Sequence, residues 1–183
     1  MSKVKIQGNA SGTGVLTIAA PNTNTDRTIT LPDGTGTLLT SISSSDMPAG
    51  SVLQVSMSED SGYAYSNSTS FVQINSVSIT GVVAGSTVYI EASINHLIEH
   101  AGYGIFAIFK GSTELARSSH NTNTNGGWRT PLNTIYAKDT SPSVGSNTYT
   151  IKMLANSSQG LYYNYSSGDT HCRSFYKLTE VAG

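Results

Sequence analysis

The sequence predicts an all-β protein, in which a short N-terminal block of strands precedes an antiparallel, jelly-roll-like β-sandwich. Three observations lead to this fold class. Runs of β-branched and aromatic residues recur along the chain, turns rich in Gly, Asn, Ser and Pro separate them, and no segment has the length and periodicity of a helix. A chain of 183 residues is long enough for one full domain with a short appendage.

Residues 1–40 form the first block of this prediction. The runs VKIQG, GVLTIAA and RTITL are short, and Pro32-Asp33-Gly34 is a strong turn signal, because proline presets φ and glycine accepts a positive φ. Strands this short bury little apolar surface, so we expect the block to need the next domain or identical chains as partners. Residues 41–50 are rich in Ser with one Pro and one Gly, and we interpret them as a linker.

Residues 51–183 carry the strands of the predicted sandwich. Val88, Ile90, Ala92 and Ile94 alternate with polar or half-polar residues, which is typical of a strand with one buried face. The predicted strands are 52–57, 71–80, 86–95, 103–111, 132–139, 147–155, 160–166 and 172–181.

Two of these strands are apolar on both faces. In 103–111, Phe106 and Ile108 lie on one face and other apolar side chains lie on the opposite face, and Phe175 breaks the alternation of 172–181 in the same way. A two-layer sandwich covers only one face of a strand, so the second face needs another cover. We therefore expect Phe106, Ile108 and Phe175 at an oligomer interface. The alternative is that a loop of the same chain covers them.

Composition excludes several function classes. Charged residues make up 11% of the chain and the net charge is -1, so no basic stripe is available for nucleic acid. No apolar run is long enough to span a membrane, and the N-terminus has no apolar signal-peptide core, so we expect a protein made in a cytoplasm. Cys172 is the only cysteine, which excludes an intrachain disulfide and a multi-cysteine metal site. A neutral surface of Ser, Thr, Asn and Gly suits extracellular fibres and capsids.

Enzymatic motifs are weak in this sequence. His96 to His100 fits the H-x-x-E-H pattern of inverted zinc peptidases, but that chemistry needs a helix, and this segment follows a β run and meets Gly102 directly. We therefore expect a strand end and loop there; alternatively, three copies of His96 or His100 meet near a threefold axis and hold an ion. No G-x-S-x-G elbow or paired acid–base carboxylates stand out. The sequence predicts no catalytic residue, no metal site and no cofactor.

Two loops are candidates for surface recognition. The loop 118–131 places a tryptophan beside an arginine among Asn and Gly, and 160–169 is rich in Tyr, Asn and Ser, a composition suited to stacking on sugar rings and bonding their hydroxyls. A weaker third candidate is 58–70. The alternative is that these rings pack under their own loops. The candidate receptor-binding residues are Trp128, Arg129, Tyr162, Tyr163, Asn164 and Tyr165.

The N-terminal block resembles a segment of bacteriophage tail-fibre and related virion proteins. The resemblance rests on Gly14 to Pro21, read as G-x-L-T-I-x-x-P, and on Arg27 to Leu38, read as R-T-I-T-L-P-D-x-T-G-T-L. It implies a homotrimer with jelly-roll-like heads in the virion, residues 1–40 serving virion attachment or trimerisation, and residues 51–183 mediating host attachment. The implied partners are other virion proteins and a host cell-surface glycan. Because the block begins at the N-terminus, with no anchoring domain before it, a capsid decoration, cement or baseplate protein is the alternative.

Overall fold

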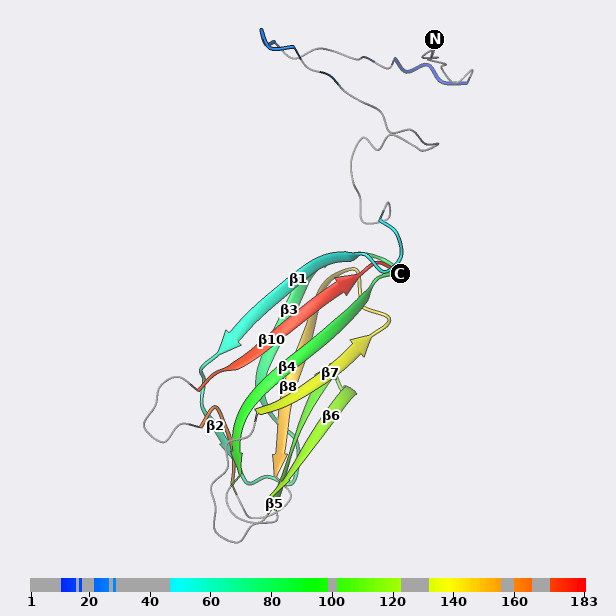
Figure 1. Cartoon of the computed structure of the whole chain (residues 1–183). Coiled ribbons are helices and arrows are strands. Elements are labelled where there is room, and N and C mark those ends of the chain that lie inside the picture. Colours follow the sequence, from blue (N-terminus) through cyan, green and yellow to red (C-terminus); the bar gives the residue numbers. More distant parts are fainter. Residues whose placement is uncertain are drawn as a thin grey trace. The chain divides into compact units, whose positions relative to one another are not determined.

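The computed structural model describes residues 11–15, 17, 22–26, 28, 47–98, 102–122, 132–155, 160–165 and 172–183. The chain divides into two compact units, Met1–Leu38 and Leu39–Gly183. Within the described residues the second unit forms ten strands and no helix (Figure 1). The strands are β1 (Val52–Asp60), β2 (Ala64–Ser66), β3 (Val72–Val82), β4 (Thr87–Ile98), β5 (Gly102–Lys110), β6 (Thr113–Thr122), β7 (Leu132–Asp139), β8 (Gly145–Ala155), β9 (Leu161–Tyr163) and β10 (Ser174–Val181).

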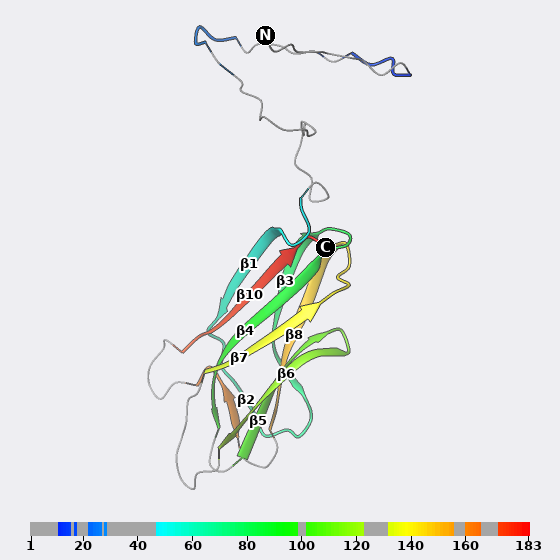
Figure 2. The same cartoon turned by 45° about the vertical axis from the view of Figure 1, so that its right-hand side comes forward.

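The strands form two antiparallel sheets packed as a sandwich (Figures 1 and 2). In the first sheet β1 pairs with β10, β10 with β4, and β4 with β7, while the short β9 and β2 extend the same sheet. The second sheet has the order β3-β8-β5-β6. Apart from β2, β9 and the hairpin β5–β6, successive strands cross between the sheets, which gives the two interlocked Greek keys of a jelly roll. The predicted all-β sandwich is confirmed.

The core lies between the two sheets and follows the alternation in the sequence. Val88, Ile90, Ala92 and Ile94 of β4 are fully buried, as their spacing predicts. From the second sheet, β8 contributes alternate residues to the same core, beginning with Tyr149.

Asp139 of β7 joins the two sheets through polar contacts. Its Oδ2 accepts hydrogen bonds from Lys110 Nζ of β5 at 2.6 Å and from the Tyr149 hydroxyl of β8 at 2.9 Å. Burial by itself raises the pKa of this carboxyl, but the hydrogen bonds from Lys110, Tyr149 and the Ser141 N–H outweigh burial and leave the pKa below its ordinary value. Asp139 is therefore a charged, fully bonded link at the edge of the core.

All eight predicted strands are present, and two strands were missed. β2 has only three residues, too few for a periodic signal. β6 has the sequence TELARSSHNT, which contains few large apolar residues, because it is an edge strand that pairs only with β5. Its C-terminal part occupies the first residues of the predicted loop 118–131.

The apolar strand β5 is covered by its own chain, so the prediction of an oligomer interface at Phe106 and Ile108 is wrong. Both side chains are fully buried in the core between the sheets. The opposite face of β5 carries Phe109, whose ring lies 5.2 Å from that of Phe71 and 4.2 Å from Lys152 Nζ. The segment before β3 and a lysine stem from β8 thus provide the second cover, in place of the predicted neighbouring subunit.

Phe175 differs from these two residues. It lies on the outer face of the first sheet and is 50% exposed, while its neighbours Tyr176 and Leu178 point into the core. Its place in an oligomer interface stays a prediction.

Candidate functional site

The first sheet is interrupted along one edge of β4, where the pairing partner of this strand changes from β10 to β9. β9 pairs with His96–Ile98 of β4 and β10 pairs with Thr87–Ser93 of the same strand. Between them, the Asn95 N–H donates to Ser174 Oγ at 3.0 Å and the Asn95 carbonyl accepts from the Asn164 N–H at 2.9 Å. Because the backbone of one residue contacts both segments, β9 and β10 follow the same edge of β4 end to end. Beside this point β1 ends at Asp60 and β2 begins at Ala64.

A chain of buried hydroxyl groups lies beneath this interruption. The Tyr163 hydroxyl donates to Asp60 Oδ2 at 2.6 Å and lies 2.6 Å from the Tyr176 hydroxyl. Each phenol has one proton, so Tyr176 donates to Tyr163 while Tyr163 donates to Asp60. Burial raises the pKa of Tyr163 well above its ordinary value, and the neighbouring Tyr176 and Asp60 raise it further. Tyr163 is therefore a protonated, fixed donor at neutral pH.

Asn164 holds the two interrupted strands together. Its Nδ2 donates to the carbonyls of Asp60 at 2.8 Å and Gly62 at 3.0 Å, and its Oδ1 accepts from Ser174 Oγ at 2.7 Å. Its φ of 51° lies in the left-handed region, which asparagine tolerates better than most residues. The Gly62 N–H donates to Asp60 Oδ1 at 2.7 Å and completes the turn after β1. These bonds fix the backbone from which the neighbouring tyrosines project.

Three tyrosines gather around the ring of Tyr162, and we call the four together the tyrosine cluster. The Tyr162 ring centroid lies 4.8 Å from Tyr65, 5.2 Å from Tyr165 and 6.1 Å from Tyr63, at tilted or edge-on angles. Tyr63 is 60% exposed and Tyr65 is 47% exposed, while Tyr162 and Tyr165 are half-buried. Tilted ring pairs of this kind stabilise one another while leaving hydroxyls and ring faces at the surface.

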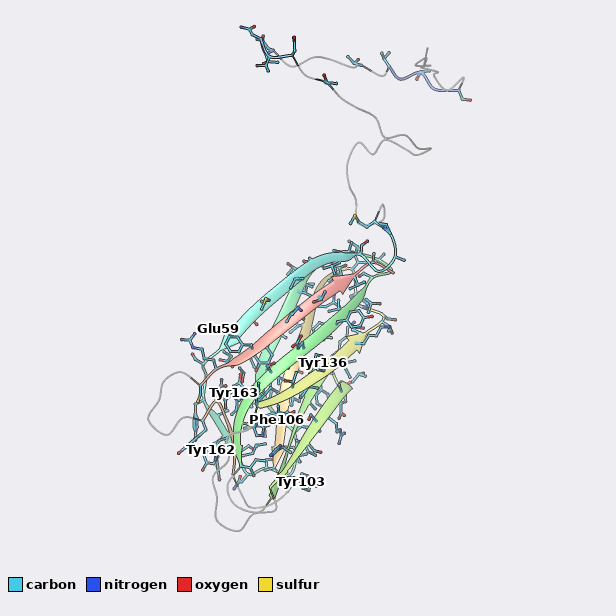
Figure 3. All side chains as sticks on the ribbon, viewed as in Figure 1. Glu59, Tyr103, Phe106, Tyr136, Tyr162 and Tyr163 are labelled. Atoms are coloured by element: carbon cyan, nitrogen blue, oxygen red, sulfur yellow. The ribbon has the colours of Figure 1, made fainter. Side chains whose placement is uncertain are left out.

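The tyrosine cluster lies at the end of the sandwich opposite to the point where the chain enters it. The chain enters beside its own C-terminus, where the Gly50 N–H donates to the Ala182 carbonyl at 2.8 Å and Val52 pairs with Val181. β1 runs from this end to Asp60, and the cluster follows beyond it. Figure 3 shows Tyr162 and Tyr103 toward this far end, and Figure 1 marks the C-terminus at the other.

The predicted site residues divide into three groups. Tyr162 and Tyr165 belong to the tyrosine cluster. Tyr163 and Asn164 are buried and hold the backbone, so their side chains do not face solvent. Trp128 and Arg129 lie outside the described residues.

Tyr63 and Tyr65 complete the cluster and were missed as individual residues. They fall within the segment 58–70, which we ranked as the weaker candidate because its composition is less distinctive. The signal that was available is the alternation of two tyrosines in SGYAYS.

The segment beginning at His96 has no helical geometry up to Ile98, because these residues belong to β4. The His96 ring is fully buried, with its centroid 4.9 Å from Phe106 and 5.5 Å from His120, and its Nε2 has no hydrogen-bond partner. Burial lowers the pKa of His96 to about 4. His100 lies outside the described residues, and the described residues contain no group of three or more His, Cys, Asp or Glu side chains placed to hold a metal ion.

Comparisons with known proteins give a weak structural likeness. No family model matches the chain, and no curated protein matches its sequence. A chain from the structure of infectious bursal disease virus, Gx strain, aligns over 72% of this chain and 38% of its own length, with 10% identity and a TM-score of 0.34. This chain therefore spans well under half of that viral chain. A likeness at this level carries no argument for function. In the described residues, no helix is long and apolar enough to span a membrane.

Proposed function

We propose that the chain is a virion structural protein, a trimeric tail fibre or fibre tip that attaches a bacteriophage to its host through the tyrosine cluster. The role is binding rather than catalysis. The observation that carries the proposal is the placement of this cluster, which is aromatic, partly exposed and held on a rigid hydrogen-bonded base at the end of the sandwich opposite to the entry of the chain.

Three properties of the cluster support recognition of a host glycan. Tyrosine rings offer flat apolar faces for the C–H faces of a sugar, and their hydroxyls bond to sugar hydroxyls. The buried bonds of Tyr163 and Asn164 fix the backbone beneath, which lowers the entropy lost on binding. Jelly rolls occur in both capsid and lectin domains, so the fold suits a virion protein that binds sugars.

The resemblance of Gly14 to Pro21 and Arg27 to Leu38 to tail-fibre segments supports the phage assignment and the trimer. In this proposal residues 1–40 join the chain to other virion proteins or to its identical partners. The chain is poor in charged residues and rich in Ser, Thr and Asn, a composition that suits exposure on a particle.

The test is adsorption. Purified full-length protein is expected to bind cells of the host bacterium and to compete with the phage for them, and Tyr65→Ala is expected to weaken this competition by roughly tenfold. Val144→Ala, at a 70% exposed apolar residue between β7 and β8 and outside the tyrosine cluster, is the control and keeps full competition. Absence of adsorption by the wild-type protein contradicts the proposal. Immunogold labelling confined to the capsid favours a decoration or cement protein instead.

A further inference from the structure

A hollow on the outer face of the first sheet forms a second candidate site, separate from the tyrosine cluster. Its volume is about 210 Å³, and its lining side chains come from β4, β7 and β10. Tyr89 and Glu91 project from β4, Tyr136 from β7, and Lys177 and Thr179 from β10. Figure 3 shows Tyr136 on β7, away from Tyr162.

The strand register explains how these side chains meet. Lys177 pairs with Glu91 and Glu91 pairs with Tyr136, so the three form one row across the sheet. Thr179 pairs with Tyr89 in the next row. Residues two positions apart on a strand point to the same face, so the two rows border one hollow.

Two exposed aromatic side chains bound the hollow. Tyr136 is 70% exposed and Tyr89 is 44% exposed, and the two rings stand diagonally across neighbouring strands. Lys138 Nζ lies 5.6 Å from the centroid of the Tyr89 ring, a cation–π contact that helps to hold this ring in place. Exposed aromatic rings with a hollow between them provide the apolar faces on which a sugar ring stacks.

The charged groups of the hollow are available to a ligand. Among the interactions of the described residues, neither the Glu91 carboxylate nor the Lys177 ammonium has a hydrogen bond, and neither belongs to an ion pair. The carboxylate accepts and the ammonium donates, and together with the Thr179 hydroxyl they match the mixed donors and acceptors of adjacent sugar hydroxyls. Their charges balance, which favours a neutral ligand.

We propose that this hollow binds a single neutral hexose ring, either free or as one unit of a glycan. Pockets for drug-sized ligands are typically about 300–1,000 Å³, so a hollow of 210 Å³ suits one ring rather than a larger molecule. The proposal rests on the sheet face alone and does not depend on attachment through the tyrosine cluster. Phe175 lies two residues from Lys177 on β10, close to the hollow. If an oligomer forms through Phe175, the hollow between β4 and β7 must stay uncovered for a sugar to bind.

The test is titration of isotopically labelled full-length protein with the methyl glycosides of glucose, galactose, mannose and N-acetylglucosamine, followed by NMR. At least one glycoside is expected to shift the amide signals of Glu91, Tyr136 and Lys177, with a dissociation constant on the order of 1 mM. Tyr136→Ala is expected to weaken binding roughly tenfold, and Glu91→Gln several-fold. Tyr136→Phe retains the ring and retains most of the binding. Tyr65→Ala, in the tyrosine cluster, is expected to leave the shifts of Glu91, Tyr136 and Lys177 unchanged. Val144→Ala is the control outside both sites.

Four outcomes overturn the proposal. The first is that no glycoside shifts these signals. The second is that the shifts persist at full strength in Tyr136→Ala. The third is that the shifts disappear in Tyr65→Ala, which would place the binding at the tyrosine cluster. The fourth is that sedimentation shows self-association through this face, abolished by Tyr136→Ala, with no sugar bound. Host adsorption is measured separately, so failure of the attachment proposal leaves this test interpretable.

Discussion

At Tyr163, one phenol oxygen lies 2.6 Å from a carboxylate and 2.6 Å from a second phenol, all beneath the interruption of the first sheet. Deleting this oxygen leaves Asp60 Oδ2 and the Tyr176 hydroxyl without their shared partner. Loss of a buried partner of this kind costs about 1–3 kcal/mol. The same hydrogen bonds therefore stabilise the sandwich and fix the backbone that positions the tyrosine cluster.

We expect Tyr163→Phe to lower the free energy of unfolding by about 1–3 kcal/mol, measured by urea denaturation. Tyr136→Phe is the matched control, because its ring is 70% exposed, and we expect a change within about 0.5 kcal/mol. Equal effects of the two substitutions would show that the hydroxyl chain does not stabilise the fold.

His96 makes the stability depend on pH. Its pKa falls from an ordinary 6.5 to about 4 in the folded protein, so as the pH drops the unfolded chain binds a proton first. Neutral His96 therefore contributes to the free energy of unfolding in full above pH 6.5. This contribution, roughly 3 kcal/mol, is lost as the pH falls from 6.5 through about 4.

We expect His96→Leu to remove this component of the pH dependence. The measurement is the free energy of unfolding of both proteins at intervals between about pH 7 and pH 4. The other histidines are common to the two proteins, so the difference in slope isolates His96. Parallel curves would contradict the assignment of a depressed pKa.

At the scale of the elements, β5 and β9 approach so closely that a side chain at Gly104 would force Leu161 to shift. A Cβ added to Gly104 of β5 would lie 2.6 Å from Leu161 Cδ1, and Leu161 is 1% exposed in the core. Glycine at this position therefore lets the second sheet pack against the end of the first, where the strand interruption begins.

We expect Gly104→Ala to lower the free energy of unfolding by about 1–3 kcal/mol through overpacking. In the background of Leu161→Ala the added methyl group has room, so the double variant should be more stable than the sum of the single effects by about 1 kcal/mol or more. Thermal or urea denaturation of the four proteins completes the cycle. Simple additivity would mean that the contact is not the cause.

At the scale of the whole molecule, the jelly roll belongs entirely to the second unit, Leu39–Gly183, and its core is drawn from both of its sheets. We expect a unit of this size with its own core to fold by itself. In the proposed function the first unit, Met1–Leu38, serves assembly, and we expect it not to be needed for the fold of the sandwich.

We expect removal of residues 1–38 to change the melting temperature of the sandwich by no more than a few degrees in calorimetry. In sedimentation, the full-length chain is expected at three times its mass of 19.2 kDa. A truncated protein that melts much earlier, or fails to fold, would show that the first unit completes the core.

The sequence by itself determined the fold class and eight of the strands, because alternation along β4 and β8 and the turns between strands are local properties of the chain. It also pointed to Tyr162 and Tyr165. Only the tertiary structure decided which face of β5 meets the core, because Phe71 and Lys152, which cover the other face, are distant in sequence. Only the tertiary structure also decided that Tyr163 and Asn164 are buried while Tyr63 and Tyr65 are exposed. The pairing of β2 with β9 determines which of these side chains are buried. It joins segments about a hundred residues apart, so a local sequence pattern cannot predict it.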